Sequence, residues 1–174
     1  MKNGFYWWNA LHPGPQQLLR ELMLEVVEKY DMDGVQGDDR LPAMPSEGGW
    51  DQFTVSLYKK STGKEPDPSA TGGQEFLQWK ADRLSDYGKS LYSAVKEKRK
   101  NCMVSWAPSI YPWSKEQYLQ DWPQWLSGGY ADYIFPQLYR YKLDAYEKIL
   151  KELQDQVPVK MKKKVFPGML TSLG

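Results

Sequence analysis

Two adjacent carboxylates, Asp38 and Asp39, close the short segment that begins at Asp33. The segment has the pattern of a short apolar strand that follows an amphipathic helix. Barrels of alternating strands and helices carry their catalytic groups at the C-terminal ends of their strands. Paired carboxyl groups in that position suit acid–base chemistry, with one group protonated and the other ionised. The pattern therefore favours an enzyme that cleaves carbohydrate.

The alternation of side chains along a strand separates the candidates in this segment. Gln36 and Asp38 face one way, while Val35 and Gly37 face the other. If Val35 packs on the helices, Gln36 and Asp38 point toward the barrel axis, where Gln36 contacts substrate. We therefore expect Asp38 to be the catalytic acid and Asp39, at the rim, to be its orienting partner. The alternative is that the acids cap the next element or bind a surface cation.

Hydrolysis of a glycosidic bond generally needs a second carboxyl group across the bond, about 5 Å away for retention and roughly 6.5–9.5 Å for inversion. Asp121 follows the second predicted strand and is the first candidate, with a structural role on a helix or loop as its alternative. Glu47, in the long loop after Asp39, is the second. A carboxylate outside this chain is the third. The sequence leaves retention and inversion open.

Further candidates for substrate contact follow the later predicted strands. Gln137 and Tyr139 share a face and suit hydrogen bonds to sugar hydroxyls. Arg140 either pairs with a catalytic carboxylate or forms a structural salt bridge. The chain has eight Trp and twelve Tyr, whose flat faces stack on the C–H patches of sugar rings but also fill cores. The stacking candidates, each with a core role as its alternative, are Trp50, Trp106, Tyr111 and Trp113.

Helical and strand patterns alternate four times along the chain, which predicts parallel strands joined by helical crossovers. A loop rich in Pro, Gly and Ser interrupts them between positions 40 and 73, with a helical turn near 52–60. The predicted helices are 13–30, 74–100, 115–126 and 142–154, and the predicted strands are 33–37, 102–107, 131–138 and 165–170.

Composition limits the class of protein. The chain has 174 residues, enough for one domain, whereas a complete (β/α)8 barrel usually needs about 250. The net charge of +1 gives no electrostatic reason to expect nucleic acid or a membrane surface as a partner, and we expect the basic run 160–164 to be solvated. With one Cys and one His, no internal disulfide forms and a His/Cys metal site is not expected. No phosphate-binding glycine loop appears, so we expect no organic cofactor and no metal beyond an incidental rim ion.

Several longer motifs occur in order along nearly the whole chain. On these motifs the chain resembles the glycosyl hydrolase-like family 10, once called domain of unknown function 187. The matching pieces are Trp8-Asn9-Ala10-Leu11-His12-Pro13, 33–39, Leu77-Gln78-Trp79-Lys80-Ala81-Asp82, Tyr118-Leu119-Gln120-Asp121-Trp122-Pro123 and Pro136-Gln137-Leu138-Tyr139-Arg140-Tyr141.

The resemblance implies a (β/α)8 TIM barrel, of which residues 1–174 form a single catalytic segment covering roughly strands four to seven. The N- and C-terminal parts of the barrel would lie outside it. It also implies hydrolysis of peptidoglycan glycan strands stripped of their peptides. Members of the family are typically exported, often as lipoproteins, so a periplasmic or extracellular location is expected, although this segment carries no signal.

This sequence departs from the family pattern at three places: Gly37 replaces a bulky apolar residue, Asn9-Ala10-Leu11 alters the first motif, and Pro167 interrupts the last strand. Three hypotheses follow. The chain is a glycosidase acting on a cell-wall polysaccharide, a non-catalytic carbohydrate-binding barrel, or an inactive fragment completed by other chain or by a partner copy. A half-barrel exposes strand edges, so self-association is expected.

Overall fold

A computed structural model describes residues 1–68 and 72–171, in which helices and strands alternate as predicted. Among these residues no helix combines the length and the apolar character needed to cross a bilayer. In chain order the elements are α1 (Pro13–Lys29), β1 (Gly34–Gly37), α2 (Gln52–Thr62), α3 (Gly73–Lys98), β2 (Met103–Trp106), α4 (Trp113–Tyr118), α5 (Trp122–Ser127), β3 (Tyr133–Ile134), α6 (Leu143–Gln156) and the 3-10 helix η1 (Val159–Lys164).

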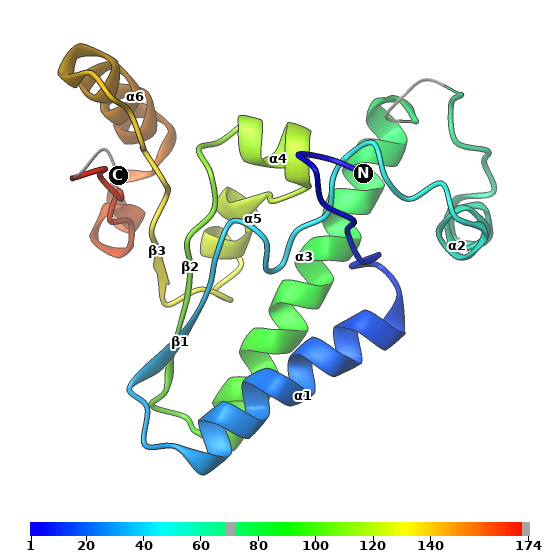
Figure 1. The fold of residues 1–174 in the computed structure, drawn as a ribbon, viewed down its shortest axis with the longest axis horizontal. Coiled ribbons are helices and arrows are strands. Elements are labelled where there is room, and N and C mark those ends of the chain that lie inside the picture. The colour runs from blue at the N-terminus through cyan, green and yellow to red at the C-terminus, as the bar shows by residue number, and fades with distance from the viewer. Residues whose placement is uncertain (69–71, 172–174) are drawn as a thin grey trace.

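The three strands form one parallel sheet in the order β1-β2-β3 (Figure 1). Val35 pairs with Val104, and Ser105 pairs with Tyr133. The α/β prediction is confirmed to this extent, but the described residues do not form a closed barrel. The predicted strand 165–170 was wrong as a continuous strand, because only single bridges occur there, from Val165 to Ile134 and from Gly168 to Gln137.

The predicted helix 115–126 is two short helices, so this prediction was also wrong. α4 ends where Leu119 adopts a left-handed φ of 61°, which an L residue rarely takes. α5 then begins at Trp122, with Pro123 in its first turn, where a missing N–H costs little. The break carries Gln120 and Asp121 into the turn between the helices. The basic run 160–164 lies in η1, where Lys160, Lys162 and Lys163 are exposed, in agreement with the expected solvation.

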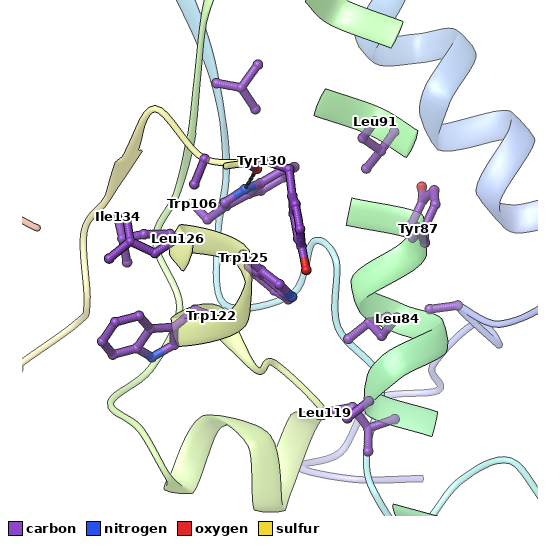
Figure 2. Close-up of a cluster of buried hydrophobic side chains, with 14 of the residues drawn as sticks. Leu84, Tyr87, Leu91, Trp106, Leu119, Trp122, Trp125, Leu126, Tyr130 and Ile134 are labelled. Carbon is purple, nitrogen blue, oxygen red and sulfur yellow. Dashed lines mark hydrogen bonds between the residues drawn. The ribbon is translucent and has the colours of Figure 1, made fainter. Parts of the chain in front are cut away.

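One face of the sheet packs on α1, α3 and α5 around a core of large aromatic side chains (Figure 2). Trp106 of β2 and Trp125 of α5 meet edge to face, with ring centroids 5.9 Å apart. Their indole N–H groups are satisfied, because Trp106 donates to the carbonyl of Tyr130 at 3.1 Å and Trp125 donates to Ser85 Oγ at 2.8 Å. These two rings are therefore both packed and hydrogen-bonded, whereas the indole N–H of buried Trp122 in the same cluster has no partner among the described residues.

The opposite face of the sheet remains open in the described structure. Gln36 and Met103 are exposed on it, and Ser105 is half-buried. The rings of Tyr133 and Phe166 meet there with centroids 5.7 Å apart, while Phe166 stays 47% exposed. This is the face that would line a barrel interior, and it carries both polar and aromatic side chains.

A carboxylate fixes the N-terminal edge of the sheet. Asp132, just before β3, accepts hydrogen bonds from the backbone N–H of Val104 at 2.7 Å and from Tyr92 Oη at 3.2 Å, and it pairs with Lys96 Nζ at 2.6 Å. Burial acts to raise the pKa of Asp132, but the Lys96 and Val104 contacts outweigh it and hold that pKa below its usual value. These bonds tie β2, β3 and α3 together at the edge away from the loops.

A buried lysine fixes the long loop after β1. Lys80 of α3 is fully buried, and its Nζ donates to the carbonyls of Ser46 at 2.5 Å and Gly48 at 2.8 Å. The ammonium also lies 4.4 Å from the centroid of the Phe76 ring. Burial lowers the pKa of Lys80 to about 8, although the charge of Glu47 opposes that change. The loop is therefore held by a charge that the fold desolvates.

We predict that stability depends on the protonation of Lys80. The unfolded chain holds this proton up to a pKa of 10.5, whereas the folded chain releases it near pH 8. Between these values the unfolded state binds more protons, so the free energy of unfolding rises with pH. Urea titrations should show that the free energy of unfolding of the wild type, relative to that of Lys80→Met, increases by up to about 3 kcal/mol from pH 7 to pH 10.

Lys89→Met is the matched control for this measurement, because Lys89 lies exposed on the same helix. The difference in the free energy of unfolding between Lys89→Met and the wild type should stay constant over this pH range. A difference between wild type and Lys80→Met that stays flat over this range would contradict the proposed burial of the charge.

Candidate active site

The C-terminal edge of the sheet presents Asp38 to solvent, directly after β1. Its Oδ1 accepts a hydrogen bond from the backbone N–H of Arg40 at 2.8 Å, which fixes the carboxylate in a tight turn. Val35 packs against the core, whereas Gln36 is exposed and donates to Ser105 Oγ at 3.1 Å. The predicted alternation along β1 is confirmed for Val35 and Gln36, and the expected acid emerges at an open edge.

Gly37 is buried, and the neighbouring strand explains why it is a glycine. A Cβ at this position would lie 2.6 Å from the ring of Trp106 and 2.2 Å from the carbonyl oxygen of Leu41. Real side chains do not approach that closely, so the bulky apolar residue that the family pattern has at this position would not fit here. The Trp106 ring fills that volume instead.

A buried amide holds the turn that carries Asp38. The fully buried side chain of Gln120 donates from Nε2 to the carbonyls of Asp38 at 3.3 Å and Pro42 at 3.1 Å. Because Gln120 sits in the break between α4 and α5, that irregular segment supports the loop after β1. Asp39 is half-buried, and its Oδ1 lies 3.8 Å from Arg40 Nε.

Asp121 occupies a different environment from Asp38. It is 8% exposed, and its Oδ2 lies 3.2 Å from Lys115 Nζ. Lys115 also donates to Gln78 of α3 at 2.5 Å, which places the pair within the helix layer. The backbone carbonyl of Asp121 accepts hydrogen bonds from the backbone N–H groups of Gln124 and Trp125 at the start of α5. The geometry favours the structural role that the sequence left open for Asp121. Glu47 is exposed and pairs with Lys2 at 3.0 Å.

The four stacking candidates occupy different environments. Trp106 is fully buried in the core, so the prediction that it stacks on a sugar was wrong. Its shared face with buried Val104 was the sequence signal for this. Tyr111 is half-buried against Trp122, with centroids 6.2 Å apart. Trp113 is 46% exposed and Trp50 is 44% exposed, so both offer open surface, with Trp50 resting on Phe76 beside α2 and α3.

The residues after β3 lie at the same edge of the sheet. Gln137 forms parallel bridges to Ser109 and Gly168, and its side chain donates to the carbonyl of Ala107 at 2.8 Å. Tyr139 and Arg140 are exposed, and the guanidinium of Arg140 donates to the Tyr139 carbonyl at 2.8 Å. Within the described structure Arg140 makes no ion pair, so neither predicted role for its charge appears.

Sequence reasoning missed an aromatic wall beside Asp38. The guanidinium of Arg40 lies over the rings of Phe5 and Trp7, at 5.2 and 5.9 Å from their centroids. Trp7 in turn lies 5.4 Å from Tyr118, which lies 5.4 Å from Trp113. A hollow of about 350 Å³ lies between this N-terminal segment, α1 and the loop after β1. The aromatic run Phe5-Tyr6-Trp7-Trp8 was the available sequence signal.

A second hollow, of about 580 Å³, is also lined by the N-terminal segment, and in part by Glu47, His12 and Asp51. His12 Nδ1 accepts from the backbone of Gly14 at 3.1 Å, and Asp51 caps α2 by accepting from Thr54 at 3.0 Å. These side chains therefore serve the helix starts. Over residues 1–68 and 72–171, no three His, Cys, Asp or Glu side chains gather as ligands for a metal ion.

Comparison with known proteins places the chain in a family. No curated protein matches it. The model of one protein family, described as glycosyl hydrolase-like 10, matches residues 3–173. Since the match spans the sheet, its helices and the loop that carries Asp38, the chain belongs to the glycosyl hydrolase-like 10 family.

Proposed function

We infer that this chain is the catalytic segment of a glycosidase that cleaves O-glycosidic bonds in a bacterial cell-wall polysaccharide. The family supports a role related to glycoside hydrolysis. The observation that carries the specific proposal is the position of Asp38, exposed at the C-terminal end of a parallel strand. In (β/α)8 barrels this is the catalytic edge, so the proposal includes a barrel in which β1, β2 and β3 are consecutive strands.

Asp38 acts in this proposal as the general acid that protonates the leaving oxygen. An acid must hold its proton at working pH, and a neighbouring negative charge favours that state. Asp39 is the adjacent carboxylate in this turn, and its Oδ1 lies 3.8 Å from Arg40 Nε. The backbone bond from Arg40 fixes one oxygen of Asp38 and leaves the other for the substrate.

The second carboxyl group lies outside this chain in our proposal. Asp121 is engaged by Lys115 in the helix layer, and Glu47 is paired with Lys2. Hydrolysis requires the two groups on opposite sides of the scissile bond. The open face of the sheet leaves space across from Asp38 where another strand of the barrel would bring such a group.

The remaining contacts orient the polysaccharide along the edge of the sheet. The Gln36–Ser105 pair, Tyr139 and Trp113 offer hydrogen-bonding groups and an exposed ring. Sugars need both kinds of contact, because their rings have apolar C–H patches and polar hydroxyls. A cell-wall polymer lies outside the cytoplasm, so the proposal includes export of the protein, as a periplasmic, extracellular or lipid-anchored enzyme. No cofactor takes part in the proposed reaction.

We predict that Asp38→Asn lowers kcat on peptide-free glycan strands by at least about 10²–10⁴, because general acid catalysis is lost. Binding of the strands should persist, since the amide keeps the size and the hydrogen bond to Arg40. Turnover is measured by release of reducing ends, with the chain expressed together with its natural flanking sequence.

Asp144→Asn is the control, because Asp144 is exposed in the first turn of α6. It should retain full activity. Undiminished turnover in Asp38→Asn would refute the assignment. A wild type that binds the strands without cleaving them would instead support the non-catalytic carbohydrate-binding hypothesis.

We also propose that residues 1–174 associate with themselves when isolated. Within the described structure β1 pairs only with β2, which leaves its outer edge free, and Met103 and Phe166 are 42% and 47% exposed on the open face. Free strand edges and exposed apolar groups promote association. Sedimentation velocity on the isolated chain should therefore show species larger than a monomer. A monomer with one cooperative melting transition would contradict this expectation.

A further inference from the structure

The hollow beside Asp38 is enclosed mainly by apolar and aromatic side chains. It measures about 350 Å³, near the lower end of the volumes typical of small-molecule sites. Four chain segments line it: the N-terminal run, the start of α1, the loop after β1 and, through Tyr87, α3. Its lining residues include Phe5, Trp7, Trp8, Leu19, Arg40 and Tyr87.

Arg40 supplies the formal charge in this hollow. Among the described residues that line it, no other Arg or Lys and no Asp or Glu is present. Asp39, outside the lining, forms an ion pair with Arg40 at 3.8 Å between Oδ1 and Nε, a distance too long for a hydrogen bond. The donors of the guanidinium thus remain available to a ligand, and the charge favours an anion.

Two aromatic rings of the N-terminal run contact the guanidinium. Arg40 lies over Phe5 and Trp7, with distances of 5.2 and 5.9 Å to the centroids. Stacking of this kind reduces the freedom that an arginine side chain loses on binding. A planar fork fixed in this way suits a carboxylate, which accepts two parallel N–H bonds.

The hollow and Asp38 are linked through the turn at Arg40, although Asp38 itself does not line the hollow. The backbone N–H of Arg40 donates to Asp38 Oδ1 at 2.8 Å, so the two residues belong to one turn. Arg40 is followed by Leu41, Pro42 and Ala43, all of which line the hollow. A glycan that places a scissile bond at Asp38 would therefore bring a neighbouring sugar unit to the hollow.

We propose that this hollow is a subsite for a carboxylate-bearing sugar unit of the glycan. Arg40 binds the carboxylate, and the rings of Phe5, Trp7 and Trp8 contact the apolar faces and substituents of the sugar. The subsite rests on the proposed function for its place in a glycan-cleaving site. Its selectivity for acidic over neutral sugar is a separate property, which binding measures without any turnover.

The test compares two forms of one ligand in the Asp38→Asn background, so that cleavage does not interfere. The probes are peptide-free cell-wall glycan strands with free lactyl carboxylates and the same strands after methyl esterification. Isothermal titration should show the carboxylate form binding at least about tenfold more tightly, as expected for a charge-assisted pair. Added Arg40→Met should remove that preference, and Arg40→Lys should keep part of it.

Two further variants separate charge from packing. Arg83→Met is the matched control, because Arg83 is similarly exposed but lies on α3, paired with Asp86 at 2.9 Å. It should leave the preference intact. Trp8→Ala should weaken both ligand forms by a similar factor, since Trp8 contributes ring surface rather than charge. Circular dichroism melts confirm that each variant is folded.

Equal binding of the two forms by the Asp38→Asn protein, or a preference that survives Arg40→Met, overturns the subsite. Absence of any binding overturns it as well. These outcomes are distinct from failure of the proposed function. If the wild type hydrolyses the strands, Asp38→Asn does not, and no carboxylate preference is measured, the proposed function stands and the subsite fails. If the preference depends on Arg40 but the wild type hydrolyses nothing, the subsite stands as a binding site for acidic glycan and the proposed function fails.

Discussion

The close contact between Trp106 and Gly37 sets the geometry of the C-terminal edge of the sheet, where Asp38 lies. The indole of Trp106 lies so near the backbone of β1 that position 37 accepts no side chain. The loop then turns back over the same glycine, because the carbonyl oxygen of Leu41 lies within 2.2 Å of where a Cβ would stand. Asp38 and Arg40 occupy this turn, so the direction of the carboxylate follows from a packing constraint beneath it.

Several motif residues support the site from behind rather than taking part in it. Gln120 fixes the turn by binding the carbonyls of Asp38 and Pro42. Lys80 holds Ser46 and Gly48 further along the same loop. Asn9 donates to Asp51 Oδ2 at 2.9 Å and so joins the N-terminal segment to the start of α2. Irregular loops have few internal hydrogen bonds, so buried polar side chains from the helices supply the missing partners.

Periodicity in the sequence predicted α1, α2, α3 and α6, the first two strands and the parallel α/β order, because these depend on local spacing of apolar residues. It also predicted the directions of Val35 and Gln36. It did not predict the break at Leu119, since a left-handed residue is set by tertiary contacts and carries no local signal. The same limit applies to Arg40, whose contacts with Phe5 and Trp7 require the chain to fold back from position 40 to the N-terminal run.

Two aspartates near strand ends show how surroundings decide the role of a carboxylate. Asp132 receives a backbone N–H, a tyrosine hydroxyl and a lysine, and these contacts, against the effect of burial, hold its pKa low. A carboxylate so fully partnered contributes to stability and has little capacity left for chemistry. Asp38 accepts one backbone N–H on one oxygen, and over the described residues its other oxygen has no hydrogen-bond partner. The sheet thus separates its roles along the strands, with locked carboxylate contacts at the N-terminal edge and an available carboxylate at the C-terminal edge. That separation is the physical reason to expect substitutions near Asp132 to alter folding and substitutions near Asp38 to alter function.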